Sequence, residues 1–328
     1  HSATAPPGFA HRCGSYRTRL SPDHPWRDPI PRFRCKACGR TFSRRTFSVE
    51  YRFHKPEHTD WLLEQFASCV SMRQSARCGK RLSRGAFARR MERIGIQGQH
   101  LLRRTRLDHL LGRLDGNFLM DEGESFEWNR LLGPVTIPVL IHKKSRLTLS
   151  NSVGTLPVRV ARKSREFREL PLESQDRKSR SSVVVKRTLA ALLQVAAPGS
   201  LLTTDLKPSY RSILRQLDPQ RRIAHETVSG REPRGVENPL FPINHTLAMM
   251  RDGLSRLRRR TWCHAKTRLR LWCHLGIYFA WKNFVRVRFN GEHETPAQLA
   301  GVTDRPWKIG DLVRWRLDLG PVSISPWE

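Results

Sequence analysis

The sequence predicts an α+β or α/β multidomain protein in which two small N-terminal modules precede a mixed sheet flanked by helices. Three observations predict this class. Residues 1–56 hold three of the seven cysteines within a basic, aromatic stretch, residues 57–106 follow a helical pattern, and short β-branched runs alternate with helical segments from about 116 to 230. We therefore expect the main domain over 107–290 and a C-terminal tail over 291–328.

The charge balance indicates the kind of partner. Lysine and arginine total 60 of the 328 residues against 29 acids, which gives a formal net charge of +31. Such a surplus is typical of proteins that bind a polyanion, and nucleic acid comes first because neutralising phosphates releases counterions. An anionic membrane surface and a merely highly charged soluble protein are the alternatives. No apolar run approaches the ~20 residues that a membrane span needs.

The cysteines and the start of the sequence indicate its compartment and its origin. Seven cysteines scattered over 328 residues do not form a disulfide framework, so we expect a reducing compartment with one local metal cluster. No secretory signal pattern is visible. Because the sequence begins at His1 rather than Met, we expect a fragment, a processed product or an incomplete reading frame.

Residues 35–39 have the sequence Cys-Lys-Ala-Cys-Gly, a turn in which two thiolates can bind one tetrahedral Zn²⁺. The glycine lets the backbone curl so that its N–H groups point at sulfur. A second such turn should end at Cys13, but the expected partner position is occupied by Ala10. Two buried thiols, a thioredoxin-like redox pair and a degenerate, metal-free ribbon are the alternatives. We predict a zinc ribbon over 1–56, with the ligands Cys13, Cys35, Cys38 and His11.

A helix-turn-helix is predicted over 57–106. Residues 71–76 form a short helix, Ser83 caps a second helix that begins at Arg84, and Gly95 closes it. The second helix buries one apolar face (Phe87, Met91, Ile94) and would enter the major groove. An ordinary helical hairpin with a solvated basic face is the alternative. The residues predicted to bind DNA are Arg84, Arg89, Arg90 and Arg93.

Two short apolar runs that end on acids predict the chemistry. The first run, 116–122, carries Asp121, and the second, 201–205, ends on Asp205, 84 positions later. Strand, hairpin, helix, strand and helix in this order form the RNase H-like layout, in which two carboxylates from neighbouring strands bind divalent metal ions. The alternative is that each aspartate only caps a helix or a turn. The other elements of this layout are predicted at 134–142, 146–153, 182–196 and 210–217, with a solvated loop over 161–181.

These pieces together resemble a known family. The segments CKACGRTFS, LMDE, TTD, NPLFPINHTLAMMRD and LSRLRRRT resemble those of the DDE-type transposases of bacterial insertion sequences. More narrowly, the chain is similar to the group that has an N-terminal zinc ribbon and in which asparagine can replace the third acid. The resemblance covers about residues 10–290.

The resemblance implies a set of catalytic residues. Asp121 and Asp205 match the first two metal-binding acids, and Asn244 falls at the place of the third. Glu237 is the second choice for that place, followed by Glu232 and Glu226. His245 should point away from the metal, because adjacent helical positions diverge by about 100°.

The resemblance also implies how DNA is held. Arg251 lies two helical turns after Asn244 and would contact a phosphate. A basic helix over Arg251–Arg270 would line the groove for the transposon end, and a last helix over Leu271–Phe289 would pack into the core. The residues predicted to contact DNA in this stretch are Arg251, Arg258, Arg259 and Arg260.

The sequence therefore predicts a transposase that binds terminal inverted repeats and cuts and joins DNA. The implied cofactors are two Mg²⁺ or Mn²⁺ ions at the acids and Zn²⁺ in the ribbon. The implied partner is double-stranded DNA, with a homo-oligomer forming on it and with no membrane or small-molecule substrate. The expected location is the bacterial cytoplasm, at the nucleoid. A catalytically inactive DNA-binding protein is the alternative, and a nuclease that acts on RNA or junctions is a third.

Overall fold

The computed structural model describes residues 8–17, 28–53, 55–78, 82–233, 235–258 and 262–315. The strands are β1 (Ala10–Tyr16), β2 (Ile30–Cys35), β3 (Thr41–Ser43), β4 (Asn117–Phe126), β5 (Pro134–His142), β6 (Thr148–Asn151), β7 (Gly154–Thr155), β8 (Leu201–Asp205) and β9 (Ala224–Val228). The α-helices are α1 (Thr59–Ala67), α2 (Met72–Arg77), α3 (Arg84–Arg104), α4 (Arg165–Arg168), α5 (Leu172–Gln175), α6 (Ser181–Val195), α7 (Pro208–Leu217), α8 (Phe241–Gly253), α9 (Arg268–Phe284), α10 (Pro296–Leu299) and α11 (Ile309–Arg314).

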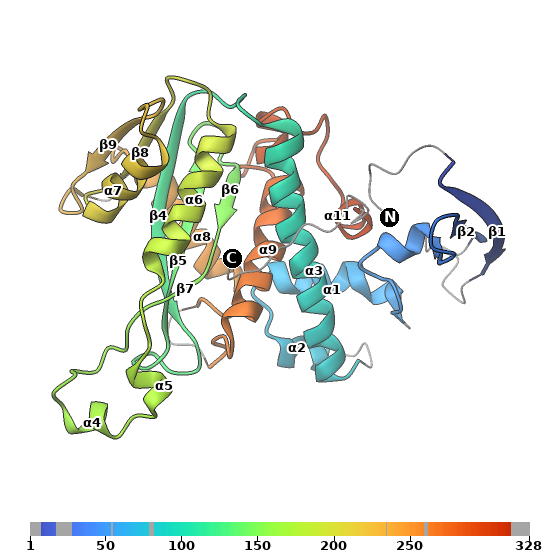
Figure 1. The fold of residues 1–328 in the computed structure, drawn as a ribbon, viewed down its shortest axis with the longest axis horizontal. Helices are drawn as coiled ribbons and strands as arrows, with labels where there is room; N and C mark the ends of the chain where they lie inside the picture. Colours follow the sequence, from blue (N-terminus) through green and yellow to red (C-terminus); the bar gives the residue numbers. More distant parts are fainter. Residues whose placement is uncertain are drawn as a thin grey trace.

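The largest sheet of the molecule is mixed and has helices on both faces, in agreement with the predicted α+β class (Figure 1). Its strand order is β6-β5-β4-β8-β9, and β7 pairs with β5. β5 and β6 are antiparallel to their neighbours, whereas β4, β8 and β9 run parallel. The strands predicted at 134–142 and 201–205 are confirmed to the residue. β4 continues past the predicted end to Phe126, because β5 pairs with it along its whole length.

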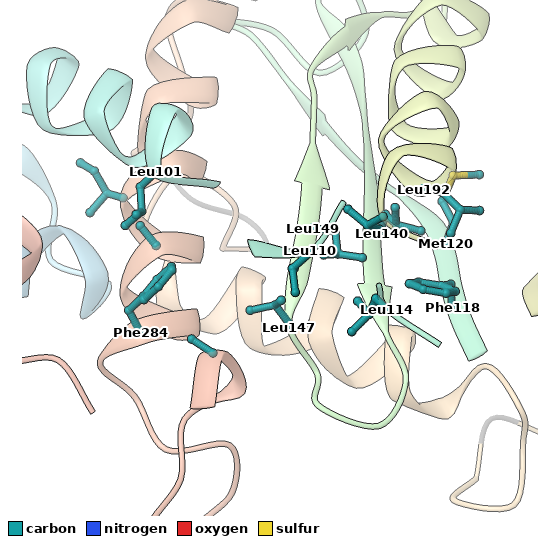
Figure 2. Close-up of a cluster of buried hydrophobic side chains, with 14 of the residues drawn as sticks. Leu101, Leu110, Leu114, Phe118, Met120, Leu140, Leu147, Leu149, Leu192 and Phe284 are labelled. Carbon is teal, nitrogen blue, oxygen red and sulfur yellow. The ribbon is translucent and has the colours of Figure 1, made fainter. Parts of the chain in front are cut away.

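Two apolar cores lie on the two sides of this sheet. Helix α6 packs against Phe118 and Met120 of β4, in a core that also holds Leu192 of α6 (Figure 2). Helices α8 and α9 cover the other face, where Leu119 and the β5 side chains pack. β5 is buried at every residue. The sheet is therefore rigid where the acids of the candidate site project from it.

Helix α3 is longer than predicted, because Gly95 does not end it. α3 lies along α9, and a Cβ atom at Gly98 would lie 2.4 Å from the carbonyl oxygen of Gly276 in α9. A Cβ atom at Gly95 would meet the backbone of Cys273 at the same distance. These glycines let the two helix backbones touch, and the apolar packing outweighs the helix-weakening tendency of glycine. The predicted inward face (Phe87, Met91, Ile94) is confirmed as buried.

The basic helix predicted over Arg251–Arg270 does not form. α8 ends at Gly253, where a Cβ atom would lie 2.5 Å from the ring of Tyr278. α9 starts separately at Arg268 behind a cap from Thr267. Between them Arg256 turns inward and is buried against the sulfur atoms of two methionines.

The stretch predicted as a C-terminal tail contains folded helices as far as Arg314. α10 and α11 pack against α9, and α11 also packs against α1. The buried side-chain amide of Gln97 in α3 donates to the carbonyl oxygens of Leu312, Val313 and Trp315. The loop predicted over 161–181 instead contains the short helices α4 and α5, which protrude beyond the sheet (Figure 1).

Within the described ranges, every helix is too short or too polar to cross a lipid bilayer.

Candidate functional site

Two aspartates come level with each other on neighbouring parallel strands. Asn117 pairs with Leu201 and Leu119 pairs with Thr203, so the register between β4 and β8 is offset by 84 residues. Asp121 and Asp205 are separated by the same 84 residues, and the register, continued by two residues, brings them side by side. Neighbouring strands lie roughly 5 Å apart where they pair. The pairing itself ends at Leu119 and Thr203, so the two predicted acids lie two residues past the last paired residues of neighbouring strands.

The alternation of strand side chains decides which face these acids occupy. Gly123, two residues after Asp121, lies against Leu247 and Met250 of α8. Leu119, two residues before, belongs to the same core. Asp121 therefore projects toward α8, whereas its neighbour Glu122 projects from the opposite face.

The electrostatics of Tyr210 give independent support for this proximity. Burial raises the pKa of this phenol well above its ordinary value, and the negative charges of Glu122, Asp205 and Asp121 raise it further. Tyr210 lies on α7 and is fully buried. One hydroxyl is thus within electrostatic range of all three carboxylates.

Glu122, to which the sequence analysis gave no role, is the most heavily bonded acid of the site. Its carboxylate is buried and accepts hydrogen bonds from Ser181 at 3.0 Å, from Tyr210 at 2.8 Å, from Thr136 and from the ammonium of Lys207. Burial alone would raise the pKa of Glu122, but the bonds from Lys207, Thr136 and Tyr210 outweigh it and lower that pKa. The group is therefore a fixed anion.

Lys207 connects this buried anion to the candidate catalytic acid. Its backbone N–H donates to Oδ1 of Asp205 at 3.1 Å, while its side chain reaches Glu122. The Asp205 carboxylate is thus oriented by the first turn after β8, and that turn is fixed to β4. The sequence marks only Glu122 itself, as a second acid directly after Asp121 in an apolar run, and gives no sign of its donors.

The third ligand position has two structural candidates. Asn244 is half-buried on α8, the helix that covers the Asp121 face. Glu226 is exposed on β9 and pairs with Thr203, which places it on the same face as Asp205. Glu237 and Glu232, the other predicted candidates, are exposed in the segment before α8.

The donor chemistry of Asp121, Asp205 and Asn244 fits Mg²⁺, which takes hard oxygen ligands. In the described part of the chain no three His, Cys, Asp or Glu side chains are grouped closely enough to hold a metal ion. A set of two aspartates and one asparagine does not belong to these groups, because its third member is an amide. The arrangement can therefore offer two carboxylates and one neutral oxygen.

The end of β2 and the turn after it contain the two cysteines predicted to form one half of a zinc site. Cys35 accepts hydrogen bonds from the backbone N–H groups of Cys38 and Ala37, and these bonds, the first above all, lower the pKa of its thiol. Gly39 lies at a φ of +66°, and its N–H closes the turn on the carbonyl oxygen of Cys35 at 2.9 Å. The predicted curl of the backbone toward sulfur is confirmed.

The other half of the zinc site is incomplete. Ala10 pairs with Cys35 across β1 and β2, so a side chain without a donor atom faces that thiol. His11 pairs with Arg34 and projects from the opposite face, and Cys13 is exposed within the irregular part of β1. These residues do not make a complete tetrahedral site in this structure.

The arginines predicted to bind DNA on α3 divide into two classes. Arg84 and Arg89 are exposed in the first two turns. Arg90 is only 4% exposed; it donates to the carbonyl oxygen of Lys55 at 2.7 Å and lies over the ring of Phe53. Arg93 likewise donates to the carbonyl oxygen of Tyr51 at 2.5 Å. Arg90 and Arg93 therefore hold the segment before α1, and only Arg84 and Arg89 of the four predicted arginines are exposed.

The basic residues after α8 are placed only in part. Arg251 is half-buried on α8, on the same helix as Asn244 as predicted, and Arg258 is exposed. Arg259 and Arg260 lie outside the described residues.

Searches with protein-family models and against curated protein sequences find no match to this chain.

Proposed function

We propose that the protein is a Mg²⁺-dependent enzyme that cleaves and transfers DNA strands, a DDE-type transposase with an RNase H-like catalytic domain. The single observation that carries the proposal is the register of β4 and β8, which brings Asp121 level with Asp205 on one face of the sheet. Two carboxylates on adjacent strands are the minimum that two-metal phosphodiester chemistry requires.

The sheet order supports this class of domain. Three antiparallel strands followed by two parallel strands, in the order β6-β5-β4-β8-β9, are the arrangement expected of an RNase H-like sheet. The acids stand where β4 has a parallel neighbour on one side and an antiparallel neighbour on the other. Strands are added on one side of β4 as far as β6 and on its other side from β8 onward, and ligands bind at such reversals of strand order.

The residues of the chain have separate roles in the proposed reaction. Asp121 and Asp205 hold the metal ions, Asn244 supplies a neutral third oxygen, and Lys207 keeps the Asp205 carboxylate oriented. When bound, two Mg²⁺ ions would activate the attacking water or 3′-OH and stabilise the leaving oxygen. Because asparagine is uncharged, the site carries one negative charge fewer than a three-acid site.

The net charge of +31 supports duplex DNA as the substrate. Arg84 and Arg89 at the start of α3 and Arg258 after α8 are exposed cations that can contact phosphates. Recognition of terminal inverted repeats would use the ribbon and α3. Because the proposed enzyme acts on two paired transposon ends, we expect at least a dimer on DNA.

Nicking of supercoiled plasmid in Mg²⁺ or Mn²⁺ tests the proposal. We expect wild type to nick and Asp121→Asn to lose about 10³-fold in rate, because several kcal/mol of transition-state stabilisation depend on the metal ions. Glu124→Gln is the matched control, since Glu124 is an exposed acid on the same strand. Equal nicking by wild type and Asp121→Asn, or none by either, contradicts the enzymatic function.

A catalytically inactive DNA-binding protein is the second candidate. The observation that favours it is Ala10, which faces Cys35 where a zinc ligand is expected. This candidate predicts tight duplex binding by wild type and Asp121→Asn alike, without nicking. Zinc content after dialysis tests the ribbon separately, and a value near one per chain would contradict a metal-free ribbon.

A further inference from the structure

A small pocket lined by cations lies on the α8–α9 side of the sheet, outside the acidic site. It opens between the turn that joins β5 to β6, helices α8 and α9, and the segment after α9, and it encloses about 390 Å³ of empty space, part of it open to solvent. None of its lining residues is acidic. The polar residues that line it are Arg146, His245, Thr246, Tyr278, Lys282, Arg286 and Arg288.

Most of the positive charge in this pocket is not neutralised by the protein. Arg288 forms an ion pair with Glu292 at 2.6 Å. Among the residues that the structure describes, no carboxylate forms an ion pair with Arg146, Lys282 or Arg286. Burial, and then the charges of Arg146 and Arg286, lower the pKa of Lys282 to about 7. Holding like charges together raises the free energy of the folded protein. Such an arrangement is expected where a ligand supplies the opposite charge.

Two of the residues that line the pocket carry buried donor atoms without partners. Nη1 of Arg146 and the hydroxyl of Tyr278 are both buried, and neither has a hydrogen-bond partner in the described chain. Leaving a buried donor unpaired is unfavourable. Because neither atom is exposed, a ligand with several acceptor oxygens would satisfy them only after the two side chains turn toward it.

The position of Arg146 is built into the fold and not left to a mobile side chain. Arg146 adopts a φ of +61°, a conformation that favours glycine or asparagine. Nζ of Lys282 donates to the carbonyl oxygen of Arg146 at 2.8 Å. The guanidinium of Arg146 lies 5.5 Å from the centre of the Phe289 ring. Strain of this kind is concentrated at functional sites.

We propose that this pocket binds a phosphate group, with Lys282, Arg146 and Arg286 as its charged donors and Tyr278 as its neutral donor. Three positive charges and a hydroxyl match the charge and the acceptor oxygens of a phosphate. A phosphodiester of bound duplex DNA is one source, which rests on the proposed function, and a free phosphate ion is the other. His245 adjoins Asn244 on α8, so the pocket begins one residue from the proposed third ligand.

Thermal unfolding of the full chain with inorganic phosphate is the first test. We expect phosphate to raise the Tm more than chloride of equal ionic strength, and Lys282→Met and Arg286→Met each to lose most of that gain. Lys186→Met is the matched control, because Lys186 is exposed on α6, and it should keep the gain. An equal gain in all variants, or in chloride, overturns the proposal. Arg286→Met carries the test if Lys282→Met does not fold.

Duplex binding by fluorescence anisotropy over a range of salt concentrations distinguishes the two sources. If the pocket takes a DNA phosphodiester, Lys282→Met binds several-fold more weakly and the salt slope falls by about one. If the phosphate gain is lost but duplex affinity and slope equal those of Lys186→Met, the ligand is free phosphate. Both measurements are independent of nicking, so the two proposals can fail separately. If the wild-type protein nicks DNA but phosphate does not raise its Tm, the phosphate pocket is overturned and the proposed function is not.

Discussion

Glu122 has a buried carboxylate and Lys282 is half-buried; the two lie on opposite faces of the same sheet, and their surroundings differ. Glu122 accepts hydrogen bonds from Thr136, Ser181, Lys207 and Tyr210, and its pKa is lowered despite its burial. Lys282 instead lies among Arg146, Arg286 and Arg288, and its pKa falls to about 7. The Glu122 charge has four donors, whereas the Lys282 charge has one acceptor, the carbonyl oxygen of Arg146, and is opposed by the neighbouring cations.

This difference separates a charge that supports the fold from a charge that awaits a ligand. A buried ion with a full set of partners stabilises its own protonation state and orients its neighbours. A buried cation beside other cations destabilises the free protein, and an anion would remove that cost. We therefore expect removal of the Glu122 charge to lower the free energy of unfolding and removal of the Lys282 charge to raise it.

Glu122→Leu gives the largest expected effect. The substitution leaves three hydroxyls, two of them buried, and one half-exposed ammonium without their acceptor, so we expect a loss of about 3 kcal/mol in the free energy of unfolding. Urea unfolding at neutral pH measures it. Glu124→Leu on the same strand is the control, since Glu124 is exposed and its ion pair with Arg159 is worth at most about 1 kcal/mol.

The pH dependence of Glu122 has a definite sign. Its pKa in the folded protein lies below the ordinary value of 4.5, so its contribution is complete above 4.5 and is lost as the pH falls through the folded value. Wild type should therefore lose stability on acidification relative to Glu122→Leu. A constant difference between the two proteins from pH 7 to pH 3 would contradict the fixed anion.

The strands that carry the acids could be predicted because each is a continuous apolar run. β8 was predicted to the residue and the start of β4 to within one residue, and the 84-residue spacing of Asp121 and Asp205 equals the register offset. The Glu122 network could not be predicted, because its donors come from β5, α6 and α7. Their meeting depends on tertiary packing, which no local pattern encodes.

Arg90→Met extends the comparison to a charge on α3 and has the next largest expected effect on the free energy of unfolding. Arg90 is compensated by a carbonyl oxygen and an aromatic ring, so its loss should cost about 2 kcal/mol and leave the salt slope of duplex binding unchanged. Arg89→Met is the matched exposed variant, and it should keep its stability and lose about one unit of salt slope. Chemical unfolding and anisotropy together check both. A lower slope for Arg90→Met would place its guanidinium on DNA.

The ends of α3 and α8 show where sequence patterns give the wrong boundary. Glycine after an apolar stripe predicts a helix end, yet Gly95 lies inside α3 because it contacts the backbone of α9. The periodic arginines after α8 predicted a helix, yet Gly253 ends α8 against Tyr278. In both cases the partner helix decides the outcome, and it lies more than 20 positions away in the sequence.

Lys282→Met should stabilise the phosphate-free protein by about 1 kcal/mol at pH 6, the reverse of Glu122→Leu. The folded pKa of Lys282, about 7, lies below the ordinary value of 10.5, so the cost of its charge is complete below pH 7 and disappears as the pH rises to 10.5. Charged or titratable groups that face it are Arg146, His245, Tyr278, Arg286 and Arg288. Urea unfolding at pH 6 and pH 9.5 measures this closing gap, and a variant less stable at pH 6 would mean that Lys282 supports the fold.

Arg146→Gly has the smallest expected effect and sharpens the comparison most. Glycine accepts a φ of +61° without strain, and the substitution also removes one of the opposed charges. Lost contact with Phe289 and the greater freedom of the unfolded chain act against this gain, so we expect a net stabilisation of about 0.5 kcal/mol without phosphate. Arg221→Gly is a matched control, because Arg221 has a φ of +52° and is exposed on the surface. If both variants gain stability and only Arg146→Gly loses its Tm response to phosphate, the strain at Arg146 is maintained for the ligand and not for the fold.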